Sequence, residues 1–541
     1  KAGGSMTEFD TPILIVGGGP VGLALASELG WRGVNCILIE RGDGDINIPK
    51  MNEVNMRSME ICRRWGIADK VINNPYPADM PFDVSFVTSL FGYELGRIPR
   101  PARKDQKPNA FSPHMLQVCS QFWFDPILKD FADSFDCVDL RYHQKLESFT
   151  QNEGGVTAAI IDQETGATST LSAHYLVSCE GANSSIRQAL GIKMEGTDEI
   201  ERAMNAFFKA PNLMAQTGLD PATFFFHIDQ GGLWANVRQI DPANDLWRIG
   251  VRNFPGEEVP DETGLNQYLH RALGRDLDVE WVDAHVWSRR AIVAETYSKG
   301  RVYLAGDAVH QLAPSGALGM NTGIGDAVDL GWKLAATVKG WGGDGLLDSY
   351  DLERRPIGTR NVEKATGFNA DHTSIAGFDG MEDDTPEAKE KRAELGDNLV
   401  TNVGNTFRTI GLQIGYCYYD SPICAADKAT APEDSSADLH TTTYPGCRAP
   451  HIWLEDGVSI LDKFAQDFTL LRFDTSLDTG VLEKAAAEHH VPITLVDIRN
   501  EAAADLYQQP LVLVRPDGHV AWRGAALPED AQAVINTISG N

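Results

Sequence analysis

Residues 11–40 read TPILIVGGGPVGLALASELGWRGVNCILIE, and this stretch decides the fold of the first part of the chain. An apolar run ends in glycines, a segment with helical spacing follows, and a second apolar run ends at Glu40. This order predicts strand, tight turn, helix and strand, the βαβ unit of a doubly wound sheet. Gly17, Gly19 and Gly22 stand in G-x-G-x-x-G register at the predicted turn.

The turn has the chemistry of a dinucleotide site. Glycine lets the backbone turn tightly and approach a pyrophosphate, whose charge the amides and dipole of the following helix stabilise. Glu40 ends the second strand, where its carboxylate can accept hydrogen bonds from a ribose diol. A glycine-rich structural turn is the alternative, because the glycine pattern alone is weak. The flanking strands and the acid favour the dinucleotide.

A second informative stretch is AGDAVHQLAPSGALGMNTG, residues 305–323. It begins where the apolar strand RVYLAGD ends and leads into a helix with an apolar stripe. The start of that helix, near Gly319, Met320 and Asn321, offers partial positive charge to a bound ligand. Asp307 could be a helix N-cap, but a cap alone would not explain the glycines around it.

Two further units follow from the pattern. The aromatic stretches AFFK, TFFFHID, GGLWANVRQI and LWRIGVR predict an antiparallel sheet separate from the dinucleotide unit. Residues 446–541 read strand, helix, strand, short helix, hairpin and helix, which is typical of a thioredoxin-like domain. The position of its CxxC reads FDTSLDTG, so we expect packing or dimer formation rather than thiol chemistry. Residues 50–66 and 114–131 are predicted to be helical, with Gln121 near the start of the second helix.

The charge and composition of the chain limit which molecules it can bind. The chain has 541 residues and a formal net charge of −29, so nucleic acid or an acidic membrane surface would be repelled. No apolar run approaches the roughly 18 residues of a membrane span, and no signal peptide opens the chain. The eight cysteines lack CxxC and metal spacing, which predicts reduced thiols, a cytoplasmic location and no metal site. Residues 1–5, KAGGS, are interpreted as a tag remnant.

Three stretches occur in an order that resembles one enzyme family: the Gly17–Gly22 turn with Glu40, CEGANSSIR at 179–187, and GDAVHQLAPSGALGMNTG at 306–323. Together they resemble the class A flavin-dependent aromatic hydroxylases, the para-hydroxybenzoate hydroxylase superfamily. YPGCRAPHIWLEDGVSILDKF at 444–464 and the thioredoxin-like tail narrow the resemblance to the phenol and dichlorophenol hydroxylase branch.

This resemblance implies an α/β (α+β) chain in five segments. Residues 6–190 and 291–370 would form a Rossmann-like FAD-binding domain, and 191–290 an inserted antiparallel-sheet substrate domain. Residues 371–445 would be a helical and linker region, and 446–541 a thioredoxin-like domain lacking CxxC.

The resemblance also implies the cofactor contacts. Asp307 would bind the ribityl chain of FAD, and Pro314 with the small residues after it would lie against the isoalloxazine ring. Gln121 would contact the flavin or its ribose, although a surface glutamine is the alternative. The predicted FAD-binding residues are Gly17, Gly19, Gly22, Glu40, Arg41, Lys50, Gln121, Glu180, Asp307, Gly319, Met320 and Asn321.

The chain departs from the family pattern at several of these positions. Glu180 stands where the family usually has aspartate, and Lys50 where an arginine is common, so the planar guanidinium is lost. The loop reads Gly316-Ala317-Leu318-Gly319 where Gly-Gly-Gln-Gly is common. Family members often have a substrate-contacting acid near the position of Asn52. Its amide can hydrogen-bond a phenol but cannot accept the proton of that phenol.

The catalytic candidates are therefore Asn52, Pro314 and Arg289. We expect His310 to order the loop. Phe224, Phe226, Trp234 and Trp247 are candidates for the substrate pocket, although alternation along a strand directs about half of such residues away from it. Arg238, Arg248 and Arg289 could meet a substrate carboxylate or the phosphates of NAD(P)H; solvated ion pairs are the alternative.

The sequence has one dinucleotide fingerprint, and the resemblance implies that NADPH or NADH binds transiently in the FAD cleft as a co-substrate. The resemblance implies hydroxylation of a small phenolic substrate with NAD(P)H and O₂, through a flavin C4a-hydroperoxide, by a homodimer. Three alternatives remain: a Baeyer–Villiger-type or polyketide-tailoring oxygenase on the same scaffold, an oxidase that releases peroxide, and a non-catalytic flavin-binding assembly protein.

Overall fold

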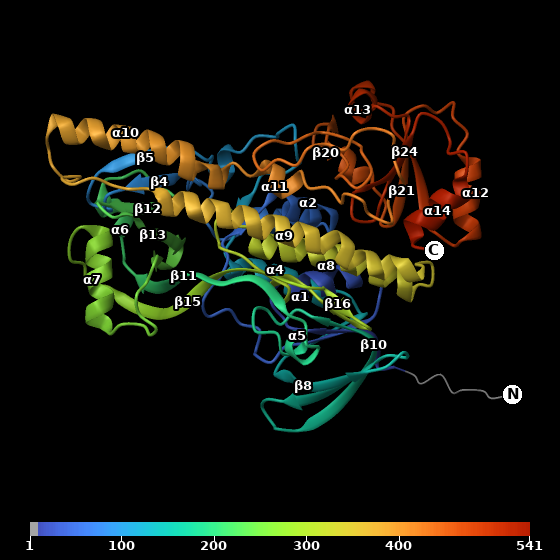
Figure 1. The fold of residues 1–541 in the computed structure, drawn as a ribbon, viewed down its shortest axis with the longest axis horizontal. Helices are drawn as coiled ribbons and strands as arrows, with labels where there is room; N and C mark the ends of the chain where they lie inside the picture. Colours follow the sequence, from blue (N-terminus) through green and yellow to red (C-terminus); the bar gives the residue numbers. More distant parts are fainter. Residues whose placement is uncertain (1–8) are drawn as a thin grey trace.

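A computed structural model describes residues 9–541; residues 1–8, which include the interpreted tag remnant, lie outside the described part. Three sheets of four or more strands organise the chain, one in each of the predicted units (Figure 1). No helix within residues 9–541 is long and apolar enough to cross a membrane. The mixed α/β architecture that the sequence predicts is confirmed.

The first sheet is the doubly wound unit. Its order is β16-β17-β10-β1-β2-β7, and β1 pairs in parallel with both β10 and β2. The central strands are apolar throughout because helices cover both of their faces. The elements are β1 (Thr11–Val16), α1 (Pro20–Trp31), β2 (Cys36–Ile39), α4 (Gln121–Asp133), β7 (Val138–Arg141), β8 (Gln144–Gln151), β9 (Val156–Asp162), β10 (Thr168–Ser178), α5 (Ser185–Ala189), β16 (Ser298–Lys299) and β17 (Val302–Leu304).

The second sheet has the order β18-β15-β11-β14-β13-β12-β4-β5. It takes β4, β5 and β18 from outside the predicted range 191–290, so that range covers only part of the sheet. The elements are β4 (Val84–Val87), β5 (Glu94–Ile98), β11 (Met194–Lys209), α6 (Leu213–Thr217), β12 (Phe224–Asp229), β13 (Gly232–Asp241), β14 (Leu246–Val251), α7 (Glu262–Leu273), β15 (Glu280–Ala294) and β18 (His310–Gln311).

Long helices connect the units. Figure 1 shows α8 (Gly319–Val338) and α9 (Asp344–Ser374) running through the middle of the molecule, between the second sheet and the C-terminal domain. α10 (Pro386–Asn402) packs on β5, and α11 (Ile410–Ile414) packs on α2 (Met56–Arg64). α2 is shorter than the predicted 50–66 helix, because β3 (Glu53–Val54) pairs with β6 (Gln117–Val118) just before it. α3 (Ala68–Ile72) follows α2.

The C-terminal domain has the predicted order of elements. The strand order of its sheet is β22-β21-β23-β24. Phe468 of β21 packs edge-on against Trp332 of α8, and this contact docks the domain on α8. The elements are β19 (Trp453–Glu455), β20 (Val458–Ser459), β21 (Phe468–Arg472), α12 (Gly480–Glu488), β22 (Ile493–Asp497), α13 (Glu501–Tyr507), β23 (Leu511–Val514), β24 (Val520–Gly524) and α14 (Ala531–Ser539).

Candidate active site

The turn between β1 and α1 is built for close backbone approach. Gly17 has φ +111°, and a Cβ there would lie 2.3 Å from the carbonyl oxygen of Cys179. A Cβ on Gly22 would lie 1.9 Å from the oxygen of Gly17, so both positions require glycine. Gly19 differs: a Cβ there would have no atom within 4 Å, and no side chain caps α1. Open space thus lies beside free amides at the start of α1, which suits a pyrophosphate.

Glu40 lies directly against this turn. Its carboxylate accepts hydrogen bonds from the amides of Gly18 (2.7 Å) and Gly42 (2.8 Å). A Cβ on Gly18 would lie 2.8 Å from that of Glu40, so a bulkier residue would displace the acid. Each oxygen keeps a lone pair for a ribose hydroxyl. Arg41, beside it, is exposed.

Asp307 stands in the short 3₁₀ turn Gly306–Ala308 that follows β17. Its side chain is accessible to solvent although protein surrounds it. This enclosure raises the pKa of Asp307, while the charges of His310 and Lys50 oppose the rise. Lys50, from the chain segment after β2, therefore lies close enough for its charge to act on the Asp307 carboxylate.

The start of α8 is also uncapped. Leu318 is its N-cap residue and makes no side-chain cap, and a Cβ on Gly319 would meet nothing within 4 Å. The Asn321 side chain is fully engaged: it accepts from the Asn55 amide (3.0 Å) and donates to the Ala317 carbonyl (2.8 Å). At this site the backbone amides face the open space, while Asn321 joins α8 to α2. Met320 packs on the core, and Pro314 is exposed.

The segment before α2 approaches the same region. The Lys50 amide donates to the Gln121 side chain (2.9 Å), whose amide nitrogen donates to Asp125 (3.0 Å). Gln121 thus fixes this segment to α4. Asn52 is buried, yet neither its Oδ1 nor its Nδ2 has a hydrogen-bond partner within residues 9–541. A buried amide without partners is costly, so these atoms are placed to bind a ligand.

Glu180 has a local role in the structure. Its carboxylate accepts from the amide of Ile186 (3.0 Å) and from the hydroxyls of Ser184 (2.8 Å) and Ser185 (2.7 Å). These bonds tie it to the start of α5. A cofactor contact by Glu180 stays a prediction.

These features fit FAD. Two uncapped helix starts, at α1 and α8, border open space at Gly19 and Gly319. The acid Glu40 suits the ribose end, and the accessible Asp307 suits the ribityl chain. The unpartnered amide of Asn52 suits a polar ring edge or a substrate. The residues present therefore fit the cofactor that the sequence predicts.

The second sheet turns one face toward the first domain. Phe207 on this face packs against Ile48 and Phe122 of the first domain, and Phe226 contacts His372 of α9. Phe224 stacks beside Phe226 with ring centroids 5.6 Å apart. This face of the second sheet therefore packs against the first domain and α9.

Trp234 and Trp247 lie on the opposite face. Both belong to the core that includes Leu265 and Leu269 of α7, and Arg271 of α7 stacks over Trp234 at 3.8 Å. Both side chains thus lie toward α7, and their assignment to the substrate pocket stays a prediction.

Three arginines share the face of the second sheet that carries Phe224: Arg238 and Arg289 are buried, and Arg248 is half-buried. Arg238 and Arg248 are direct cross-strand partners, and Arg238 stacks over the Phe224 ring at 3.8 Å. Neither takes part in an ion pair within residues 9–541, and each has at least one guanidinium N–H without a partner. Arg289 pairs with Glu201 (3.0 Å), which Arg252 shares (2.9 Å).

Burial lowers the pKa of these side chains. The pKa of Arg238 and of Arg289 falls to about 10, although the nearby charges of Glu53 and Glu201 respectively oppose the fall. The pKa of Arg248 falls to about 9, because burial is reinforced by the charges of Arg238 and Arg289. The cluster is thus a site of concentrated positive charge that lacks a full set of acidic partners.

Comparison with known proteins agrees with this site. Residues 10–365 match the family described as FAD binding domain, and residues 442–541 match the aromatic-ring hydroxylase, C-terminal domain. The chain therefore belongs to the FAD-dependent aromatic-ring hydroxylases, and it is a flavin-dependent aromatic monooxygenase that uses FAD. The resemblance found in the sequence is confirmed.

Individual relatives span almost the whole chain. Tetracenomycin B2 monooxygenase-dioxygenase of Streptomyces olivaceus is 33% identical over 98% of this chain and 98% of its own. Phenol 2-monooxygenase of Pseudomonas sp. is 29% identical over 98% and 93%. The structure of the rebeccamycin biosynthetic enzyme RebC with reduced flavin superposes with a TM-score of 0.91 and 37% identity, covering 98% and 99% of the two chains.

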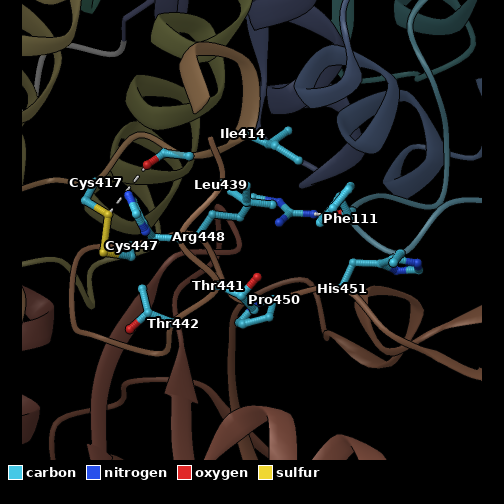
Figure 2. A pocket seen from close by; sticks show the side chains of 13 residues that line it. Phe111, Ile414, Cys417, Leu439, Thr441, Thr442, Cys447, Arg448, Pro450 and His451 are labelled. Atoms are coloured by element: carbon cyan, nitrogen blue, oxygen red, sulfur yellow. Dashed lines mark hydrogen bonds between the residues drawn. A yellow bond between two sulfur atoms is a disulfide. The ribbon is translucent and has the colours of Figure 1, made fainter. Parts of the chain in front are cut away.

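A small recess elsewhere corrects one expectation. Figure 2 shows it between the linker and the start of the C-terminal domain, with Phe111, Ile414, Arg448 and His451 among its lining residues. None of the predicted FAD residues lines it, so it is separate from the active site. Cys417 and Cys447 form a disulfide on its wall, so the prediction of reduced thiols is wrong for this pair.

Proposed function

We propose that the protein hydroxylates a phenolic ring of an aromatic substrate that also carries a carboxylate. The observation that carries the proposal is the adjacent pair of Arg238, which is buried, and Arg248, which is half-buried; neither has an acidic partner within residues 9–541. Bound FAD, reduced by NADPH or NADH, supplies the transfer of oxygen from O₂. The chain's residues bind and orient the substrate.

The arginine pair suits a carboxylate for electrostatic reasons. Burying a charge without a partner is unfavourable, and a planar guanidinium binds a carboxylate with two parallel hydrogen bonds. An anionic substrate would supply the missing acceptors to Arg238 and Arg248. Arg289 has its own acid, Glu201, and so adds long-range positive potential.

Asn52 and the two phenylalanines complete the assignment. The free Oδ1 and Nδ2 of Asn52 can accept from a phenol or donate to a phenolate, but the amide takes no proton. The arginine cluster stabilises the phenolate form of a substrate through its positive charge. Phe224 and Phe226 place apolar area beside the arginines and exclude water from the ring.

A second candidate, polyketide tailoring, is favoured by the relatives. A relative from Streptomyces halstedii, 32% identical to this chain, is named a putative polyketide hydroxylase, and a RebC structure soaked with chromopyrrolic acid contains 7-carboxy-K252c. The first name supports a polyketide, and the second supports a ligand with a carboxyl group, over a simple phenol. Phenol 2-monooxygenase supports the simple phenol.

The test compares matched aromatic acids and their methyl esters as stimulators of NADPH and NADH oxidation. Peroxide is counted, and ¹⁸O₂ labels any product. We expect acids to stimulate oxidation and to gain one labelled oxygen. Arg248→Gln should raise KM for the acids at least about tenfold and leave the esters unchanged. Arg271→Gln, an exposed arginine on the α7 face, is the matched control. Equal use of acids and esters, or peroxide without labelled product, would contradict the proposal.

Other expectations remain predictions. The homodimer that the resemblance implies is measured by light scattering, and the cytoplasmic location by fractionation of the source cells. The choice between NADPH and NADH follows from the oxidation assay itself.

A further inference from the structure

We propose that Asp326 is a positioning residue for the flavin loop, defined as Gly306–Gly319, and that the C-terminal domain reaches Asp326 through Tyr418 and Arg354. The inference rests on the proposed function only in taking the loop that carries Asp307 as an FAD contact. It assigns a role in FAD binding to a domain that has no cofactor residues of its own among those predicted.

Asp326 lies on α8, and its carboxylate is completely buried. One oxygen, Oδ2, accepts from the amide of Gly306 (3.1 Å) and from Nε2 of His310 (2.6 Å). The other oxygen accepts from Nε of Arg354 (2.8 Å). Burial alone would raise the pKa of Asp326, but the charges and hydrogen bonds of His310 and Arg354 hold it below its ordinary value. An ionised carboxylate therefore holds two points of the flavin loop.

These two points lie on either side of Asp307. Gly306, whose amide donates to Asp326, directly precedes Asp307 and has a φ of +68°. His310 follows three residues later. A shift of the Asp326 carboxylate would therefore move Asp307 with the loop that carries it.

Arg354, on α9, joins this carboxylate to the start of α8. Its Nη2 donates to the carbonyl oxygen of Thr322 (3.0 Å) in the first turn of α8. A Cβ on Gly325 would lie 2.7 Å from Nη2, so the guanidinium lies directly against the helix. One buried guanidinium thus fixes both the uncapped helix start and the flavin loop.

Tyr418 completes the connection. Its hydroxyl accepts from Nη1 of Arg354 (3.1 Å), and the side chain is buried. The C-terminal domain sets its place: its amide donates to the Gly446 carbonyl (2.8 Å), and its ring stacks on His519 with centroids 4.4 Å apart. Cys417, the preceding residue, is bonded to Cys447. The path from domain to loop is therefore Tyr418, Arg354, Asp326, Gly306.

The experiment titrates each apoprotein with FAD and follows flavin fluorescence and the visible circular dichroism of the bound flavin. Tyr418→Phe removes only the hydroxyl, so Arg354 loses one acceptor. We expect FAD to bind about fivefold more weakly. Asp326→Asn should weaken FAD at least about fiftyfold, because Gly306 and His310 lose a charged acceptor. Tyr419→Phe is the matched control: that residue is exposed, its hydroxyl donates to Pro432, and FAD affinity should stay unchanged.

The double variant Tyr418→Phe/Asp326→Asn gives the sharpest test. If the path runs through Asp326, adding Tyr418→Phe to Asp326→Asn weakens FAD no further. The proposal would be overturned if the effects of the two substitutions on the FAD dissociation constant multiply fully, or if Tyr418→Phe binds FAD as tightly as the wild type does. Thermal unfolding of the apoproteins separates positioning from stability, since a purely structural role would lower the midpoint but leave FAD affinity of the folded protein intact.

Should Asp326→Asn fail to fold, Tyr418→Phe and its control still decide the question. FAD titration needs no aromatic substrate, so its outcome is independent of the proposed substrate. Normal hydroxylation with unaltered FAD affinity in Tyr418→Phe would overturn this inference alone. A wild type that binds no FAD would remove the proposed function as well.

Discussion

Asp125, on α4, makes the folded protein less stable as pH rises, and we expect the substitution Asp125→Asn to abolish this loss. The side chain is 3% exposed; Oδ2 accepts from Gln121 (3.0 Å), and Oδ1 has no partner within residues 9–541. Burial raises the pKa of Asp125 to about 7, and the bond from Gln121 only partly opposes the rise. Between pH 4 and pH 7 the folded protein therefore holds a proton that the unfolded chain has released.

The sign and size follow from linkage. Because the folded-state pKa lies above the unfolded value, the protonated carboxyl's contribution is full below about pH 4 and is lost as pH rises through 7. The interval between 3.8 and about 7, at 1.36 kcal/mol per pKa unit, corresponds to at most about 4 kcal/mol. The amide introduced by Asp125→Asn would keep an acceptor for Gln121 and stay neutral at every pH.

Urea unfolding of the apoprotein from pH 4 to pH 8.5 measures the effect. We expect Asp125→Asn to match the wild type near pH 4 and to exceed its stability by up to about 4 kcal/mol at pH 8.5. Asp130→Asn, an exposed acid on the same helix, is the control and should show no such divergence. A difference that stays constant across the range, or a wild type that gains on the variant as pH rises, would refute the reasoning.

Three other substitutions have defined outcomes. Gly19→Ala should leave the thermal midpoint of the apoprotein unchanged but weaken FAD binding at least about tenfold, because the new Cβ enters the open space before α1. Gly22→Ala should also destabilise the apoprotein, because its Cβ clashes with Gly17. Equal midpoints for the two variants would count against the open-space assignment. Ala317 has φ +52°, so Ala317→Gly should stabilise the protein by about 0.5–1 kcal/mol in urea unfolding, and a loss of stability would show that the backbone there is not strained. Cys447→Ser should lower the free energy of unfolding by about 3–4 kcal/mol under non-reducing conditions, given the 30-residue separation from Cys417, and should have little effect under reducing conditions. An equal loss of stability under both conditions would mean that the two cysteines are not bonded in solution.

Local pattern was sufficient to predict several elements. The β1–α1–β2 unit follows from apolar periodicity and three glycines, and the order of the C-terminal elements follows from strand and turn signals. The predicted helix 114–131 starts too early: residues 117–118 form β6, and α4 begins at Gln121, where Ser120 caps the helix. The predicted start of α2 was too early, although the cap residue Asn55, whose side chain accepts from the Ser58 amide, marks the true start.

Features that depend on distant pairing were not predictable in this way. The face on which Trp247 lies depends on strand register, which no local pattern reveals, and the same holds for the recruitment of β4 and β5 to the second sheet. The disulfide joins cysteines 30 residues apart in unrelated segments. The ion pair of Asp326 with Arg354 also joins distant segments, although acidic residues in a largely apolar helix such as α8 are a usable signal of buried ion pairs.

The most direct test of the account is the binding of FAD to the purified apoprotein and to its Asp307→Ala variant, measured by flavin absorbance and fluorescence. We predict that the wild type binds one FAD per chain and becomes yellow, and that Asp307→Ala weakens this binding at least about tenfold. A wild type that stays colourless after incubation with FAD, or an Asp307→Ala variant that retains full affinity, would contradict the placement of FAD between the Gly17 turn and the Asp307 loop.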